Sequence, residues 1–93
     1  MKVDLTRGRC ACGCGRTTGR RFARGHDAIL RAALVRALLA SEPVVVQRGE
    51  SVQDQDARGV AALLDAPSVA YHGWAPWAEA LDRAERRFRA VAR

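Results

Sequence analysis

The sequence contains no asparagine, only one lysine, and no apolar run of the roughly 18 residues needed to cross a membrane. Fifteen of its sixteen basic side chains are therefore arginine. Together with abundant alanine, this bias is typical of a GC-rich coding sequence, so arginine's suitability for binding phosphate is not by itself an argument for function. The first residues also lack the apolar stretch of a secretory signal, and we expect a cytoplasmic protein with no membrane contact.

The length of the chain limits the architecture. Ninety-three residues are too few for a large enzyme scaffold such as a (β/α)8 barrel, and they correspond to one small domain or to a small domain with an appended module. Hydrophobic residues make up 48% of the chain and charged residues 28%, which favours a folded domain. Because such a small domain buries a modest share of its surface, a metal ion or a partner often stabilises it.

The net charge of +6 is distributed unevenly along the chain. Residues 1–40 carry nine basic and two acidic side chains, a net charge of +7, whereas residues 41–75 carry −3 and residues 76–93 carry +2. The positive charge is therefore concentrated in the N-terminal part of the chain. Basic side chains in such a concentration are able to neutralise the phosphates of a nucleic acid.

The pattern of apolar residues predicts helices and a short strand. Leucine recurs every four positions in residues 28–40, which predicts a helix that Asp27 caps and that ends before Pro43. The β-branched residues 44–47 predict a strand, followed by a turn at 48–50. Ser51 and Asp54 resemble a capping box, which predicts a second helix over residues 52–64.

A third helix is predicted to begin at Pro76, after residues 69–74, which we expect to be a loop or an extended segment able to pair with the strand at 44–47. Apolar residues at steps of four and three predict one continuous buried face, and acid–arginine pairs four residues apart predict a solvated outer face. The apolar face comprises Trp77, Leu81, Ala84, Phe88 and Val91, and the outer pairs are Glu79–Arg83, Asp82–Arg86 and Glu85–Arg89.

Three cysteines and a histidine form the most informative group in the sequence. Cysteines two residues apart make poor disulfide partners, so in a reducing compartment their spacing favours metal binding. Three thiolates and one imidazole are typical of a closed structural zinc site, which leaves no position for a catalytic water and argues against an enzyme. We predict a structural Zn²⁺ ion bound by Cys10, Cys12, Cys14 and His26.

Other interpretations of this group remain open at the level of sequence. If one of the closely spaced cysteines cannot reach the metal, His72 or Asp27 is a possible fourth ligand. Free cysteines with a histidine at the helix start, a redox dithiol, or another soft metal are the alternatives to zinc. Gly13 and Gly15, which each follow a cysteine, are expected to let backbone amides turn toward the sulfurs.

The string C-x-C-G-C-G-x-x-T, followed by R-R-F and G-H-D, resembles a short zinc-binding module of actinobacterial and actinophage proteins. That module occurs in small stand-alone proteins and ahead of HNH-type homing endonuclease domains. The resemblance covers residues 10–27 and implies metal binding at the three cysteines and His26, and a phage or prophage origin. The nuclease core requires further histidines and an asparagine, so nuclease activity is not implied. The matching residues are Cys10, Cys12, Gly13, Cys14, Gly15, Thr18, Arg21, Phe22, Gly25, His26 and Asp27.

These observations predict a small, mainly helical α+β domain stabilised by zinc, with three helices and one or two short strands. We expect residues 1–27 to form a zinc knuckle and residues 28–93 a small helical domain packed against it. The predicted function is a regulator or accessory factor that contacts DNA or RNA. The alternative is a protein-interaction module that docks on a host or phage protein complex. The side chains predicted to contact nucleic acid are Arg16, Arg20, Arg21, Arg24 and Arg31.

Overall fold

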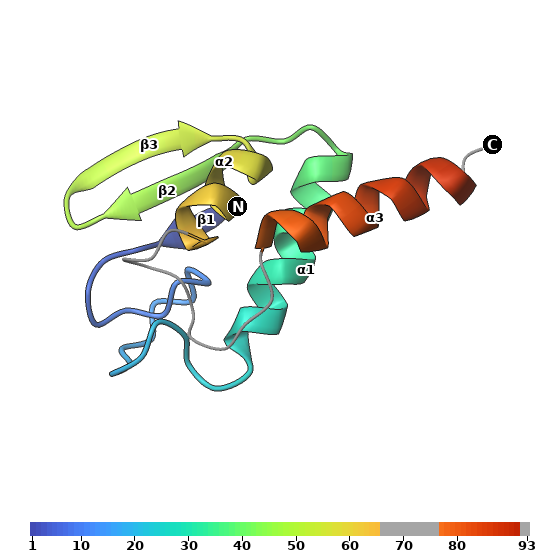
Figure 1. Ribbon diagram of the computed structural model, residues 1–93. Helices are drawn as coiled ribbons and strands as arrows, with labels where there is room; N and C mark the ends of the chain where they lie inside the picture. Colours follow the sequence, from blue (N-terminus) through green and yellow to red (C-terminus); the bar gives the residue numbers. More distant parts are fainter. Residues whose placement is uncertain (66–76, 92–93) are drawn as a thin grey trace.

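The computed structural model describes residues 1–65 and 77–91, and these form a small α+β domain with three helices, as the sequence predicts (Figure 1). The sheet has three strands, whereas one or two are expected. Residues 69–74, including His72, lie outside the described residues. In chain order the elements are β1 (Lys2–Asp4), α1 (His26–Leu39), β2 (Val44–Arg48), β3 (Ser51–Gln55), α2 (Ala57–Asp65) and α3 (Trp77–Val91).

The sheet has the strand order β1-β2-β3. Strand β1 runs parallel to β2, with Lys2 opposite Val45, and β3 runs antiparallel to β2, with Arg48 opposite Ser51. The long connection that parallel strands require is supplied by the loop of residues 5–25 and by α1. Strand β1 is not predicted from the sequence, because three residues are too few to show a period of two. Its pairing with β2 nevertheless places the cysteine loop beside the sheet.

The predicted helix over residues 52–64 is wrong in its first half. Residues 51–55 form β3, which pairs along its whole length with β2, and α2 begins only at Ala57. Asp56 caps this helix in place of Ser51, because its Oδ1 atom accepts a hydrogen bond from the amide of Gly59 at 2.6 Å. Residues 51–55 therefore form a strand despite their resemblance to a capping box, because a strand at this position completes the hydrogen bonds of β2.

Helix α1 begins at His26, two residues before the predicted start. Asp27 is not its cap: it lies in the first turn, where a negative charge interacts favourably with the helix dipole. The residue before the helix is Gly25, with φ 81°, and no side chain caps the helix. A left-handed glycine at this point turns the chain out of the loop and directly into the helix.

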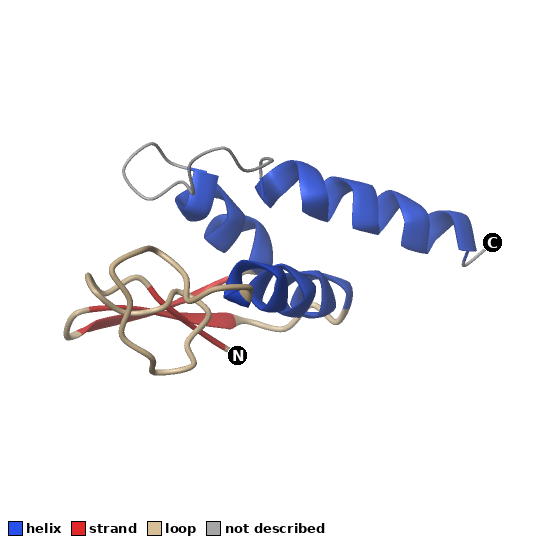
Figure 2. Cartoon of the chain, turned by 90° about the horizontal axis from the view of Figure 1, so that it is seen from below, coloured by secondary structure: helices blue, strands red, loops and turns tan. Residues whose placement is uncertain are grey.

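The buried apolar side chains come from every described element except β3. Helix α2 packs against α1 and α3 and also contacts β2 and β3 (Figure 2). Residues 1–25, which have too few apolar side chains for a core of their own, contribute to the common one. The ring of Phe22 stacks on Trp77, with centroids 5.7 Å apart and planes at 25°. The largest fully buried side chains are Leu30, Leu34, Leu64, Leu81, Val3, Val44, Val60 and Cys10.

Helix α3 is buried only in its N-terminal half. Trp77 and Leu81 are buried, but Phe88 is 52% exposed and Val91 is 80% exposed, so the predicted continuous buried face is wrong for the last two turns. In both views the end of this helix extends beyond the other elements (Figures 1 and 2). No described helix is long and apolar enough to cross a membrane.

Polar contacts join the two ends of the α2–α3 connection. The carboxylate of Asp65 caps α3 by accepting hydrogen bonds from the amides of Trp77 at 2.7 Å and Ala78 at 3.1 Å. Arg58 of α2 binds Asp82 at 2.5 Å and Glu85 at 2.8 Å. The predicted pair Asp82–Arg86 does not form, because Asp82 binds Arg58 instead. The predicted pairs Glu79–Arg83 and Glu85–Arg89 form at 4.0 and 2.6 Å.

Candidate metal centre

The loop of residues 5–25 is held by backbone hydrogen bonds that run between its own segments and to β1. The amide of Cys10 donates to the carbonyl of Arg16 at 2.9 Å, and the amide of Ala11 donates to the carbonyl of Arg21 at 2.8 Å. The amide of Asp4 donates to the carbonyl of Ala11 at 3.1 Å, which ties the cysteine segment to the end of β1. The loop therefore has a defined path despite its low apolar content.

Two glycines shape the segment that carries the cysteines. Gly13 has φ 84°, and a Cβ atom there would collide with the carbonyl oxygen of Lys2 in β1. Gly15 has φ 86° with open space around it, and the turn it makes points the amide of Arg16 at the sulfur of Cys14, 3.5 Å away. The first glycine allows close packing on the sheet, and the second allows an amide to face a thiol.

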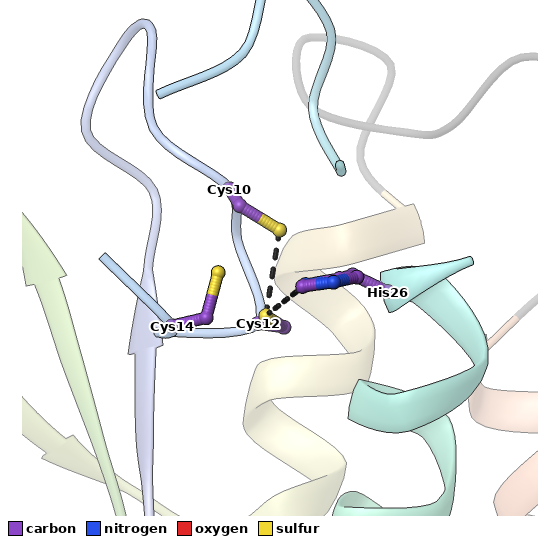
Figure 3. A group of neighbouring side chains, drawn as sticks. All are labelled: Cys10, Cys12, Cys14 and His26. Atoms are coloured by element: carbon purple, nitrogen blue, oxygen red, sulfur yellow. Dashed lines mark hydrogen bonds between the residues drawn. The ribbon is translucent and has the colours of Figure 1, made fainter. Parts of the chain in front are cut away.

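All four predicted ligands lie together. One ligand atom from each of Cys10, Cys12, Cys14 and His26 lies within 4.8 Å of the other three. The Sγ atoms of Cys10 and Cys12 are 3.4 Å apart, and Nδ1 of His26 lies 3.2 Å from Sγ of Cys12 (Figure 3). Sulfurs around one tetrahedral zinc ion lie about 3.8 Å apart, given the usual Zn–S length. The side chains have the spacing of a metal site.

Although the three cysteines lie within five residues of sequence, their sulfur atoms are directed toward a common point. Gly13, between Cys12 and Cys14, has a left-handed backbone, and the sulfurs of these two cysteines converge with that of Cys10 from different directions (Figure 3). His26 is the first residue of α1, and its side chain reaches the cysteine sulfurs from the start of that helix. Asp27 is not a member of this cluster. His72, the other alternative ligand, lies outside the described residues.

The surroundings of the three sulfurs differ. Cys10 is buried and accepts a hydrogen bond from the amide of Ala23 at 3.1 Å, Cys12 is half-buried, and Cys14 is exposed. Burial, together with hydrogen bonds in which the Cys12 thiol donates to the neighbouring sulfurs, raises the pKa of Cys12 to about 12. The amide of Arg16 lowers the pKa of Cys14. A bound divalent cation deprotonates such thiols outright, so metal binding releases protons.

The amides of Ala23 and Arg16 were not identified from the sequence. Both donate to cysteine sulfurs, and neither follows a cysteine directly. Such donors stabilise and orient thiolate ligands. The expected role of Gly13 and Gly15 is thus only partly right, because the donor to Cys14 is the residue after Gly15, and Gly13 is required by its contact with β1.

The five arginines predicted to contact nucleic acid differ in their surroundings. Arg16, Arg20 and Arg24 are exposed in the loop, and Arg31 is exposed on α1. Arg21 is half-buried, and its Nη1 atom donates to the carbonyl of Leu5 at 3.2 Å, so part of its donor capacity is used to fasten the loop to the chain after β1.

Comparison of the chain with protein-family models, with curated proteins and with solved structures finds no match. The resemblance of residues 10–27 to the actinophage module stays an expectation from the sequence. The clustering of the cysteines and His26 is therefore the principal observation from which a function can be argued.

Proposed function

We propose that this is a small zinc-binding protein in which Zn²⁺ fastens the N-terminal loop to α1 and β1, so that arginines of the loop contact the phosphates of a nucleic acid. In this proposal it acts as a regulator or accessory factor of phage or prophage origin. The observation that carries the proposal is the convergence of three thiols and one imidazole within 4.8 Å.

The donor set favours zinc in a structural role. Thiolates and imidazole are the ligands that Zn²⁺ prefers, and four of them complete a tetrahedral shell with no place for a reactive water. Bound zinc would join Cys10, which is buried beside the core, to His26, the first residue of α1. The ion would thus supply the stabilisation that the few apolar side chains of the loop do not.

Metal analysis tests this part of the proposal. Protein purified without added metal should contain one equivalent of zinc, and Cys12→Ser should lower the metal content and the affinity. A zinc content near zero, or unchanged affinity in Cys12→Ser, contradicts the structural-zinc assignment. Reconstitution with Zn²⁺ and with Co²⁺, whose d–d absorption reports tetrahedral thiolate coordination, distinguishes a specific site from adventitious binding.

The charge of the loop supports contact with nucleic acid. Residues 5–26 include six arginines and no acidic residue. Arg20 and Arg24 are exposed, and neither forms an ion pair with any residue in the described ranges 1–65 and 77–91. Arginines that keep their charge unpaired are available to phosphates, and each such contact releases counterions and makes binding dependent on salt.

The test compares two double variants that remove the same charge. Arg20→Ala with Arg24→Ala changes the loop, and Arg83→Ala with Arg86→Ala changes the exposed side of α3. Binding to several unrelated DNA and RNA fragments is measured between about 50 and 200 mM salt. The loop variant should weaken binding to all fragments and lower the salt slope by about one per lost contact, or two in all.

The control pair should have little effect on this slope. Equal weakening by both double variants would show that only net charge matters, and absence of binding by the wild type at low salt would refute the nucleic-acid part of the proposal. Arg21 is not substituted, because removing its side chain would also remove its hydrogen bond to the carbonyl of Leu5 and so disturb the loop structure.

A further inference from the structure

The three candidate cysteine ligands differ in their access to solvent. Cys10 is buried, Cys12 is half-buried and Cys14 is exposed. An exposed sulfur is open to oxidants in solution, whereas a buried one reacts mainly with groups that the fold brings to it. The sulfur of Cys14 is therefore the point at which an oxidant can reach this group of ligands.

The surroundings of Cys14 favour its thiolate form. The amide of Arg16 donates a hydrogen bond to its sulfur at 3.5 Å. Residues 5–26 include six arginines and no acidic residue, so the sulfur lies in a positively charged segment. Partly exposed cysteines in electropositive surroundings are typically the reactive ones, because the thiolate is the nucleophile.

Cys10 is placed to react with an oxidised Cys14. The amide of Gly13 donates to the carbonyl of Cys10 at 3.2 Å, and the amide of Cys10 donates to the carbonyl of Arg16 at 2.9 Å. The chain therefore returns to Cys10 on both sides of Cys14, and the two sulfurs lie within 4.8 Å of each other. Since an S–S bond is about 2.05 Å long, the side chains have to close a gap of at most about 2.8 Å.

Cys12 is the poorer disulfide partner for either of the other two cysteines. Its sulfur lies 3.4 Å from that of Cys10, but a single residue separates it from each neighbour in the chain, and so small a ring strains a disulfide. Its sulfur is also 3.2 Å from Nδ1 of His26. Cys12 and His26 are therefore expected to remain as they are while the outer two cysteines react.

We propose that a peroxide oxidises Cys14 and Cys10 to an intramolecular disulfide, and that this modification releases the metal. The inference rests on the zinc site of the proposed function and not on the contact with nucleic acid. It makes the site sensitive to oxidants, with the exposed cysteine as the entry point and the buried one as the resolving thiol.

The reaction balances with hydrogen peroxide as the oxidant. The thiolate of Cys14 attacks one peroxide oxygen, so that an S–O bond forms, the O–O bond breaks, and the leaving hydroxide takes up a proton to become water. The thiolate of Cys10 then attacks the sulfur of the resulting sulfenic acid, the S–S bond forms, and the second hydroxide leaves and is protonated. In total, two electrons pass from the two sulfurs to the peroxide.

The disulfide removes two of the four ligands. Cys12 and His26 alone are too few to form the closed shell of a structural zinc site, so Zn²⁺ is expected to leave. The reverse change needs only a thiol reductant and Zn²⁺, because a disulfide is a reversible product, unlike a sulfinic or sulfonic acid.

Differential labelling of the intact, zinc-loaded protein tests which cysteines react. After treatment with hydrogen peroxide, free thiols are alkylated, and the disulfide is then reduced and alkylated with an isotopically heavy form of the same reagent. Trypsin places all three cysteines in one peptide, residues 10–16, because it cleaves after arginine. Fragmentation of this peptide should show the light label on Cys12 and the heavy label on Cys10 and Cys14.

A metallochromic indicator follows zinc in the same reaction. Each disulfide formed should release one equivalent of zinc, and a dithiol reductant with added Zn²⁺ should restore the bound metal. Two variants that each lack one cysteine are compared in the metal-free state. Cys12→Ser keeps the proposed pair and should form the disulfide as fast as the metal-free wild type, whereas intramolecular disulfide formation in Cys14→Ser should be slower by about tenfold or more.

Four results overturn the inference: a heavy label on Cys12, equal rates in the two variants, a sulfinic acid at Cys14 without a disulfide, and zinc that stays bound after Cys14 has been oxidised. The last result would leave the proposed zinc site intact. A protein that binds no zinc would instead refute the proposed function and the release of metal with it, while labelling of the metal-free protein would still decide whether Cys10 and Cys14 form the pair.

Discussion

The N-terminal loop and the helical part of the molecule are held by different means. In the helical part, side chains such as Leu34 and Leu64 are fully buried and the helices pack on one another and on the sheet. In residues 5–25, backbone hydrogen bonds and left-handed glycines determine the path, and four ligands converge where apolar contacts are few. A small chain can thus combine an apolar core with a segment whose path depends on local backbone geometry and which carries a candidate metal site.

The contrast is not complete, because the loop also contributes to the core. Phe22 stacks on Trp77, and Cys10 is both a candidate ligand and a fully buried side chain. The candidate metal centre and the core therefore share Cys10. Changes that act on only one of them should show how strongly they are coupled.

The largest expected effect is that of metal removal. Chelation should release residues 5–25 and expose Trp77 on its Phe22 side, while most of the helical circular dichroism remains, because all three helices lie outside the loop. Each kcal/mol of stabilisation lost should lower Tm by about 4–8 °C in a domain of this size. Hydrogen exchange resolved by residue is the measurement, with loss of protection expected first at Ala11 and Ala23.

The matching change in the helical part is Leu34→Ala. Leu34 is fully buried, so this substitution should lower the free energy of unfolding by about 2–5 kcal/mol and reduce the helical signal cooperatively. Complete loss of helical circular dichroism on chelation alone would contradict the difference between the two regions. In that case the metal organises the whole domain.

A smaller effect is expected from Gly13→Ala. The added Cβ would meet the carbonyl oxygen of Lys2, and the left-handed backbone itself costs an alanine about 1–2 kcal/mol. The control is Gly15→Ala, which has the same backbone region but open space, so only the backbone cost applies. Zinc affinity and thermal unfolding of both variants are measured, and equal losses would show that contact with β1 does not position the cysteines.

The smallest expected effect concerns Asp4 and pH. Burial raises the pKa of this carboxyl, but hydrogen bonds from Thr6 and the charges of Lys2 and Arg9 outweigh it, and the net pKa is lowered. A lowered folded-state pKa means that Asp4 stabilises the fold above its unfolded pKa of about 3.9 and that this contribution is lost as pH falls through the folded value.

Urea unfolding of the wild type and Asp4→Asn at several pH values measures this contribution. The wild type should be the more stable of the two at pH 7, and the difference should shrink below about pH 4. A difference that is constant from pH 7 to pH 2 would show that the charge of Asp4 does not contribute.

The sequence predicts the helices best where side-chain spacing and burial agree. The three helices, the strand at 44–47 and the end of α1 before Pro43 follow from local signals. Strand β3 could not be predicted in this way, because its side chains are mostly exposed and its order depends on the hydrogen bonds of β2. The exposed end of α3 has the same periodicity as its buried half, so periodicity alone does not reveal where the core ends.

The sequence alone determined the identity of the candidate ligands and the concentration of positive charge near them, because both depend on residue type and spacing. Only the tertiary structure decided that the three cysteines and His26 converge, that Arg21 fastens the loop, and that Phe88 and Val91 stay exposed. These outcomes depend on β1 pairing with β2, on Gly13 packing against Lys2, and on the extent of the surface that α1 and α2 offer to α3. Contacts between residues distant in the chain set each of them, and no local pattern records those contacts.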